Sequence, residues 1–266
     1  MAPPTAPGAG EGRAADRANA LHYGTPDAVD AYLERPYHRL RQRLCRELVQ
    51  EALGRAFPGL AAAGRRVLEL GASSGALARE LAAGCGAVVA GDREAAVLGW
   101  TRGSAVRGVC LDAERGLPFA TGRFHAVVMA ELIEHVFDTR SLLGECHRVL
   151  ADGGVLGLTT PNLATLQDRL RFLLGRAPRQ VDPLHEYLYL HIRPFSYRSL
   201  TRALAASGFG GFRLRSNHVV LRWGGGRRLE SRLLARLWPG LGGSLIVTAT
   251  KSGAPPARVA GGRPEV

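Results

Sequence analysis

The sequence predicts an α/β fold in which helices cover both faces of a doubly wound, mostly parallel sheet. The main observation is an alternation: from Arg65 onward, short apolar runs typical of buried strands take turns with segments of helical periodicity. This order favours parallel strands joined by right-handed crossovers. The second observation is length, because 266 residues are enough for one large domain with its own core.

Seven strands are expected, and helices at 76–83, 95–101, 139–150 and 197–207 connect them. The expected strands are 67–70, 87–90, 106–111, 126–130, 155–159, 212–215 and 245–250. The last two close the sheet around an insertion at 224–243 that is rich in glycine and arginine and contains an amphipathic pattern at 229–238. We therefore expect a helix inside this insertion.

Apolar residues at helical spacing between 27 and 57 predict an N-terminal helical cap of one or two helices, with Pro36 starting or breaking one of them. The resulting organisation is a single domain over 18–252. It comprises the cap (18–63), the first half of the sheet (64–160) and a second half with insertions (161–252). The tails, 1–17 and 253–266, are small, polar and proline-rich, and we expect them to be disordered.

Composition argues against several classes of protein. No window reaches the ~18 apolar residues of a membrane span, and the N-terminus lacks the basic start and apolar run of a secretory signal, so a cytoplasmic location is expected. The four cysteines are scattered without a C-x-x-C pair. This pattern favours reduced thiols over a disulfide framework or a zinc site, and no metal is expected.

The net charge of +12 comes almost entirely from arginine, because Lys251 is the single lysine among 35 basic residues. The arginines are spread along the chain, which favours a solvated basic surface over a nucleic-acid or anionic-membrane footprint. A nucleic-acid partner is therefore not expected, whereas an anionic substrate stays open. Arg169, Arg171 and Arg176 are the arginines that such a substrate would meet, in and just beyond a helix expected over 162–175.

The sequence that follows the first strand carries the strongest motif. Glu69 stands near the end of the strand, and small residues follow it at Gly71, Ala72, Ser73 and Gly75 before the next helix begins. Such a turn lets a ligand approach free backbone N–H groups at a helix N-terminus, which suits a carboxylate or a phosphate. This turn alone is a modest signal, since many α/β proteins have one.

Two acidic residues at later strand ends strengthen the signal. Asp92 closes the second strand about 20 residues on, where a carboxylate can accept both hydroxyls of a ribose. Asp112 closes the third strand, where it can accept from an adenine amino group. The run from Phe124 to Val136 and the turn Asp152-Gly153-Gly154 complete the series.

With these motifs the chain, from about Arg65 to Lys251, resembles the class I S-adenosylmethionine-dependent methyltransferases, in particular the type 11/type 23 group that includes ubiquinone-biosynthesis-like enzymes. The resemblance implies a Rossmann-like seven-stranded sheet with S-adenosylmethionine as methyl donor, a cofactor-binding half at 64–160 and a substrate side at 161–252. It assigns the methionine end of the cofactor to Glu69 and the turn, the ribose to Asp92, and the adenine to Asp112. The remaining implied cofactor neighbours are Arg93, Ala113, Ala130 and Glu131.

The sequence departs from the family pattern at two positions. Ser73 stands where a second glycine is usual, which would place a serine in the left-handed conformation at a cost of ~1 kcal/mol. His125 stands where aspartate is usual, and packing explains it better than chemistry. A nicotinamide dinucleotide site and a domain that has lost its cofactor are the alternatives, but the glycine spacing does not fit G-x-G-x-x-G.

Two histidines are candidate catalytic residues because they lie in an aromatic segment after the fifth strand: His191 and His185. Each is a candidate general base, and each also fits a structural role as a hydrogen-bonding side chain that holds its loop. His135, which follows Glu134, fits a structural role.

Methyl transfer to an O, N or C atom of a small molecule is the function that the sequence favours (class 2.1.1). The Asp/Asn-Pro-Pro-aromatic turn typical of enzymes that methylate a base amine is absent after the fourth strand. An RNA- or peptide-directed methyltransferase and a non-catalytic S-adenosylmethionine-binding protein remain alternatives. The acceptor and the oligomeric state cannot be derived from the sequence.

Overall fold

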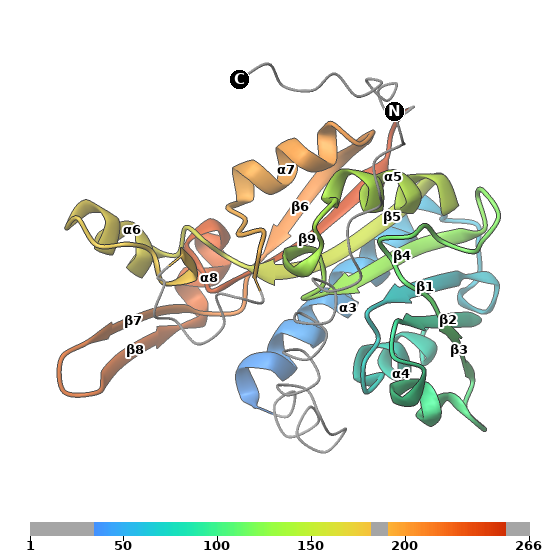
Figure 1. Ribbon diagram of the computed structural model, residues 1–266, viewed down its shortest axis with the longest axis horizontal. Coiled ribbons are helices and arrows are strands. Elements are labelled where there is room, and N and C mark those ends of the chain that lie inside the picture. The colour runs from blue at the N-terminus through green and yellow to red at the C-terminus, as the bar shows by residue number, and fades with distance from the viewer. Residues whose placement is uncertain (1–34, 182–190, 254–266) are drawn as a thin grey trace, which may run out of the picture.

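The computed structural model describes residues 35–181 and 191–253. They form a seven-stranded sheet of order β3-β2-β1-β4-β5-β9-β6, in which β9 runs antiparallel to both of its neighbours and the other strands are parallel (Figure 1). The strands are β1 (Arg66–Leu70), β2 (Ala87–Asp92), β3 (Val106–Cys110), β4 (Phe124–Ala130), β5 (Leu150–Pro161), β6 (Phe209–Arg215) and β9 (Ser244–Lys251). The predicted Rossmann-like doubly wound sheet is confirmed.

Helices cover the two faces of this sheet, with α5 and α7 on one side and α3 and α4 on the other (Figure 1). Their bounds are α3 (Pro36–Ala56), α4 (Ala76–Ala82), α5 (Thr139–Val149) and α7 (Tyr197–Ala205). The helix α3 is the described part of the predicted cap, and it begins at Pro36, which is well placed in a first helical turn. The predicted tails lie outside the described residues, apart from Gly253.

The strands alternate their side chains between two apolar cores, which is why the sheet is buried on both faces. In β4, Val127 and Met129 join the core under α5 and α7, whereas Ala126 and Val128 join the core under α3 and α4. The same alternation in β5 sends Leu156 to the first core. A strand buried on both faces reads as a continuous apolar run, and this is the pattern that predicted it.

The register of the parallel strands brings their carboxyl ends to one edge. Leu70 of β1 lies opposite Gly91 of β2 and Met129 of β4, and Ala130 lies opposite Thr159 of β5. The loops that follow these strands therefore meet at one edge, where doubly wound sheets bind their ligands.

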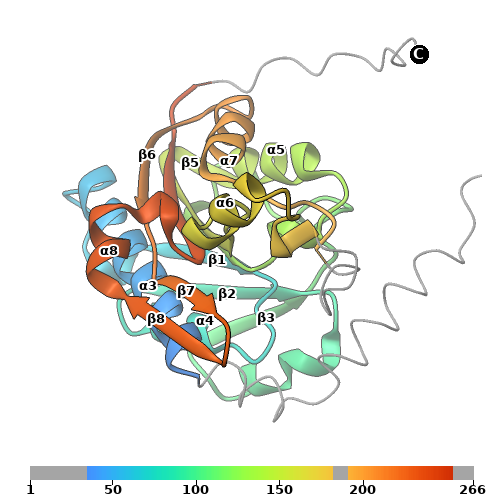
Figure 2. The same cartoon turned by 90° about the vertical axis from the view of Figure 1, so that its left-hand side faces the viewer.

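A group of short elements projects from the sheet near β9 and is here called the arm, residues 162–181 and 219–241 (Figures 1 and 2). It contains α6 (Leu166–Leu173), the hairpin of β7 (Val219–Trp223) and β8 (Arg227–Ser231), and α8 (Arg232–Leu237). The Gln167 side-chain amide donates to the Arg222 carbonyl oxygen at 2.9 Å and ties α6 to β7. No helix among the described residues is long and apolar enough to span a bilayer.

The structure corrects the predicted insertion. The helix expected over 229–238 begins only at Arg232, where Ser231 accepts from the Leu234 amide at 3.1 Å as its N-cap. The preceding residues form the hairpin instead. Gly225 and Gly226 adopt φ of 76° and 73°, which lets the chain reverse sharply between β7 and β8. The helix expected at 95–101 is also a 3-10 helix rather than an α-helix.

Candidate functional site

The loop after β1 has the backbone that a close ligand approach requires. Gly71, Ser73 and Gly75 all have positive φ, at 71°, 45° and 75°. The amides of Gly71 and Ala72 donate to the Gly91 carbonyl oxygen at 2.8 and 3.2 Å, which fixes the loop against β2. Ser73 thus adopts the left-handed conformation that its place in the motif predicts, at the cost expected for a residue with a Cβ.

Trp100 is packed against this loop and fixes its shape. Its indole N–H donates to the Ser73 carbonyl oxygen at 2.9 Å, and a Cβ on Gly75 would lie 2.1 Å from the indole ring. Only glycine therefore fits at position 75, for reasons of both φ and space. The Arg79 guanidinium lies over the Trp100 ring, with its Cζ 5.1 Å from the ring centroid, in a cation–π contact.

Asp92 stands at the end of β2, half-buried, with its carboxylate turned to the loop. One carboxylate oxygen accepts from the Ser73 amide at 2.9 Å, and the other accepts from the Glu94 amide at 3.0 Å. Each oxygen keeps a further lone pair, so the carboxylate can also accept hydroxyl donors. The loop and the end of β2 are therefore one connected unit.

Glu69 is 2% exposed, so its carboxylate lies inside the protein rather than at the open edge. The Ala78 amide in the first turn of α4 donates to it, which places an acid at a helix N-terminus. Burial raises the pKa of Glu69 to about 8, with the negative charge of Asp92 adding to the effect. Its Oε2 has no hydrogen-bond partner among the described residues.

Asp112 follows β3 and is half-buried. Its carboxylate accepts from the Glu114 amide at 3.0 Å and lies 3.4 Å from the Arg115 Nε. Ala113 packs against the apolar core beside it. Arg93, the residue after Asp92, is exposed, and its carbonyl oxygen accepts from the Cys110 thiol at 3.3 Å.

The end of β4 carries the second non-glycine residue with positive φ, Glu131, at 56°. Its amide donates to the Thr159 carbonyl oxygen at 2.9 Å, and its carboxylate accepts from the Thr159 hydroxyl at 2.9 Å. The carboxylate also pairs with Arg41 of α3 at 2.9 Å. The Arg41 side chain is 3% exposed and Glu131 is partly exposed, so the ion pair is only partly shielded from water, and it joins α3 to the edge next to Ala130.

His191 lies close to this edge in the segment that follows residue 190. Its Nδ1 lies 3.1 Å from the Gln180 side-chain oxygen, so this nitrogen carries the proton if the two are hydrogen-bonded. Its ring meets that of His135 edge to face, with centroids 4.9 Å apart. The other candidate, His185, lies outside the described residues.

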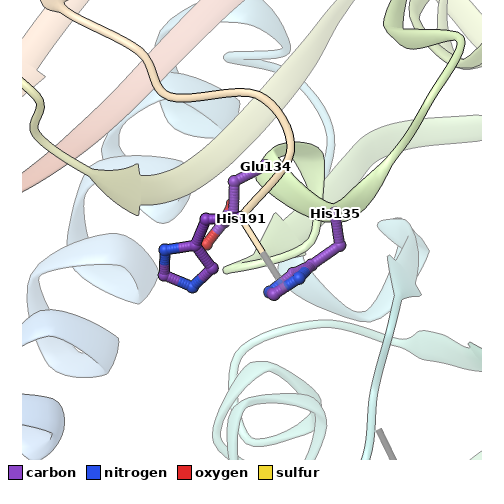
Figure 3. A group of neighbouring side chains, drawn as sticks. All are labelled: Glu134, His135 and His191. Atoms are coloured by element: carbon purple, nitrogen blue, oxygen red, sulfur yellow. The ribbon is translucent and has the colours of Figure 1, made fainter. Parts of the chain in front are cut away.

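Glu134, His135 and His191 form a cluster, which Figure 3 shows converging below the turn that follows β4. Their ligating atoms lie within 4.8 Å of one another, a spacing that could hold a divalent cation. Glu134 is 1% exposed, and neither carboxylate oxygen makes a hydrogen bond among the described residues. Burial, and then the nearby charge of Glu131, raise the pKa of Glu134 well above its usual range.

Sequence reasoning missed four residues of this region: Arg41, Trp100, Glu134 and Gln180. Arg41 and Gln180 come from distant segments, and no local spacing links them to the edge of the sheet. Trp100 left a faint signal as a bulky residue in a stretch of small ones. His125, by contrast, packs as predicted: its Nδ1 accepts from the Arg66 amide at 3.0 Å, and its ring contacts Phe57.

Comparison with known proteins agrees with this geometry. A family model described as a methyltransferase domain matches residues 37–211. A protein of Mycolicibacterium smegmatis named "Probable S-adenosylmethionine-dependent methyltransferase" is 32% identical over 151 residues, which is 55% of this chain and 52% of that protein. The ubiquinone biosynthesis O-methyltransferase of Pseudomonas aeruginosa is 33% identical over 106 residues, 38% of this chain and 46% of the enzyme. The chain thus spans about half the length of the curated relatives it matches.

Solved structures show the same fold at lower sequence identity. The 1,6-didemethyltoxoflavin-N1-methyltransferase of Burkholderia thailandensis, solved with 1,6-didemethyltoxoflavin and S-adenosylhomocysteine, superposes with a TM-score of 0.58 at 20% identity. The match covers 95% of this chain and 93% of that one. A protein of Bacillus halodurans described as a "putative methyltransferase" matches with a TM-score of 0.55 at 20% identity, over 75% of this chain and 98% of that one. With the family model matching well over half of its residues, the chain belongs to the class I S-adenosylmethionine-dependent methyltransferases.

Proposed function

We propose that this protein transfers the methyl group of S-adenosylmethionine to an O, N or C atom of a small molecule. The observation that carries the proposal is the joint position of Asp92 and Ser73. The Asp92 carboxylate and the left-handed Ser73 backbone are held together at 2.9 Å, at the carboxyl edge of the sheet. This geometry supports a ribose and an amino-acid moiety being bound side by side.

The residues present fit this cofactor. Asp92 retains lone pairs for the two ribose hydroxyls. Asp112 and Ala113 follow the next strand, β3, where an adenine amino group and ring can be received. In the loop after β1, small residues leave the backbone open to a closely bound ligand. Glu131, at the end of the neighbouring strand β4, is held by Arg41 and Thr159. When bound, S-adenosylmethionine supplies an electrophilic methyl group on a sulfonium.

The tasks left to the chain are alignment, exclusion of water and, for some acceptors, removal of a proton. The donor would leave as neutral S-adenosylhomocysteine, so its positive charge would pass to the acceptor together with the methyl group. A hydroxyl acceptor must therefore also lose its proton, and the chain has to hold the acceptor in line with the methyl carbon and receive that proton. His191 is the described residue proposed to take that proton, with His185 as the second candidate, because a proton on Nδ1 facing Gln180 puts the basic lone pair of the His191 ring on Nε2.

A small-molecule acceptor is favoured over a macromolecular one by one relative's name and by one feature of the chain. The Pseudomonas relative is named for an O-methylation in ubiquinone biosynthesis. The described residues contain no additional domain of the kind that binds RNA. RNA- or peptide-directed methylation and non-catalytic cofactor binding are the outcomes that would replace this proposal.

The test combines binding with turnover. Calorimetric titration with S-adenosylhomocysteine is expected to show binding that Asp92→Ala weakens about 30- to 150-fold, as the loss of a charge-assisted hydrogen-bond pair would. Glu94→Ala, an exposed neighbour, is the matched control and should bind normally. Radiolabelled methyl transfer into a metabolite extract then tests catalysis. Label that enters only RNA or protein, or binding without any turnover, would contradict the small-molecule proposal.

A further inference from the structure

The arm exposes most of the large apolar side chains that the described surface carries. Ten of the twelve exposed large hydrophobic residues lie on it. They are Leu170, Phe172, Leu173, Leu174, Val181, Trp223, Leu229, Leu233, Leu237 and Trp238. Phe172 is 70% exposed and Leu173 is 81% exposed. Scattered apolar residues are normal on a protein surface, but a concentration on one projecting unit marks a surface that binds something.

These side chains belong to all three parts of the arm. In α6 the buried residue is Asp168, which accepts from the Thr165 hydroxyl at 2.6 Å, whereas Leu170, Phe172 and Leu173 are exposed. The helix α8 does the same, with Ala235 buried and Leu233 exposed. Between α6, β7 and α8 lies an apolar recess of about 310 Å³, lined by Leu166, Val219, Leu234, Trp238 and Leu241.

The same arm is strongly basic. It holds nine arginines and two acidic residues, and both acids are already engaged. Asp168 is buried against Arg179 at 3.3 Å, and Glu230 lies 3.5 Å from Arg228. The structure pairs no carboxylate of the described residues with the exposed Arg222, Arg227 or Arg236. The apolar residues are therefore surrounded by positive charge that this arm does not neutralise.

We propose that the arm docks on the surface of an anionic lipid bilayer. Leu, Phe and Trp beside arginine form the composition of elements that lie in a membrane interface, where the apolar side chains enter the acyl boundary and the cations meet lipid phosphates. A nucleic acid would match the arginines but would leave the exposed leucines in water. A second copy of the chain would match the leucines but would bring the two basic arms together. A bilayer of negative charge satisfies both observations.

Vesicle flotation with the full chain tests the proposal. The protein is expected to float with phosphatidylcholine vesicles that contain about 30 mol% phosphatidylglycerol and not with phosphatidylcholine alone. Binding should fall as salt rises from about 50 to about 500 mM, because the attraction between arginine and lipid phosphate is screened. No flotation with the anionic vesicles at low salt would overturn the proposal.

Two matched pairs of variants locate the surface. Phe172→Ser with Leu173→Ser should reduce the bound fraction about tenfold, whereas Phe137→Ser, which is equally exposed but lies off the arm, should not. Arg227→Glu with Arg228→Glu should do the same, whereas Arg198→Glu with Arg202→Glu on α7 should leave most binding intact.

Equal losses in the control variants would mean that binding follows net charge and would overturn the arm as the site. Light scattering tests the remaining alternative, that a second copy of the chain covers this surface. A dimer that the Phe172 and Leu173 double variant dissociates, without any change in flotation, would assign this surface to a second copy of the chain instead.

Discussion

The indole N–H of Trp100 donates to the carbonyl oxygen of Ser73, and the ring occupies the space that a side chain at the end of the same loop would need. The contact joins a 3-10 helix after β2 to the loop after β1. Together with the Asp92 carboxylate, which accepts from the Ser73 amide, it holds both polar groups of the Ser73 peptide units in fixed directions. The loop is thus preorganised before any ligand arrives, which lowers the entropy that binding must supply.

Gly75→Ala should damage this loop. The new Cβ meets the Trp100 ring, and the residue must also keep a φ of 75°, so a loss of about 2–4 kcal/mol of unfolding free energy is expected together with weaker cofactor binding. Gly99→Ala is the control, because its Cβ would meet no atom within 4 Å. Denaturant unfolding and calorimetry measure the two effects. Equal stabilities of the two variants would contradict the steric account.

Arg41 should matter to stability more than the other arginines of α3. Arg41→Ala leaves Glu131 without its buried cation, and a loss of about 2–4 kcal/mol in the free energy of unfolding is expected. This loss is smaller than for a fully buried ion pair, because Glu131 is partly exposed. Arg43→Ala, on the same helix but exposed, should cost less than about 0.5 kcal/mol. A double-mutant cycle with Glu131→Gln isolates the pair. A coupling energy near zero would show that Arg41 acts through its other contacts.

The stability of the cofactor-free protein should depend on pH through Glu69. Its folded pKa of about 8 lies above its ordinary value of 4.5, so folding favours the protonated form. This contribution is fully present below pH 4.5 and is lost as pH rises towards and through 8. Glu69→Gln mimics the protonated form and should therefore gain in stability relative to the unmodified protein between pH 5 and 8.5. Thermal melts of both proteins across that pH range test this prediction. Melting temperatures that change with pH in parallel would refute the raised pKa of Glu69.

His191 is the described histidine to test for chemistry. If it removes a proton, His191→Ala should lower turnover about 10²–10⁴-fold with cofactor affinity and melting temperature unchanged. Gln180→Leu removes the side-chain oxygen that faces the Nδ1 of His191 but keeps the imidazole, so it should lower turnover less. A fall in melting temperature and cofactor affinity together would instead assign a structural role.

The same assay addresses the expected absence of a metal. Turnover should survive exhaustive chelation, and Glu134→Gln should be well tolerated because burial raises the pKa of this carboxyl and so favours its uncharged form. Activity that chelation abolishes and a divalent cation restores would assign the Glu134, His135 and His191 cluster to a metal and contradict that expectation.

The sheet was predictable because strands buried on both faces leave a continuous apolar signal, and its observed strands begin or end within a few residues of the expected ones. The insertion was not, since 229–238 fits helical spacing while two glycines with positive φ turn its start into a hairpin. The positions of Asp92 and Asp112 at strand ends follow from the alternation of strands and helices in the sequence. Arg41 and Gln180 could not be found, because long-range contacts such as the Arg41–Glu131 pair leave no periodic trace in the sequence.

Gln180, His191 and Arg193 link the arm to the turn that follows β4. Gln180 and His191 contact each other at 3.1 Å, and the Arg193 amide donates to the Glu134 carbonyl oxygen at 3.0 Å. The arm and the turn after β4, which are far apart in the sequence, are therefore joined through these two contacts. A substitution at Gln180 can thus be felt at Glu134 through His191 and Arg193, without any change in the sheet between them.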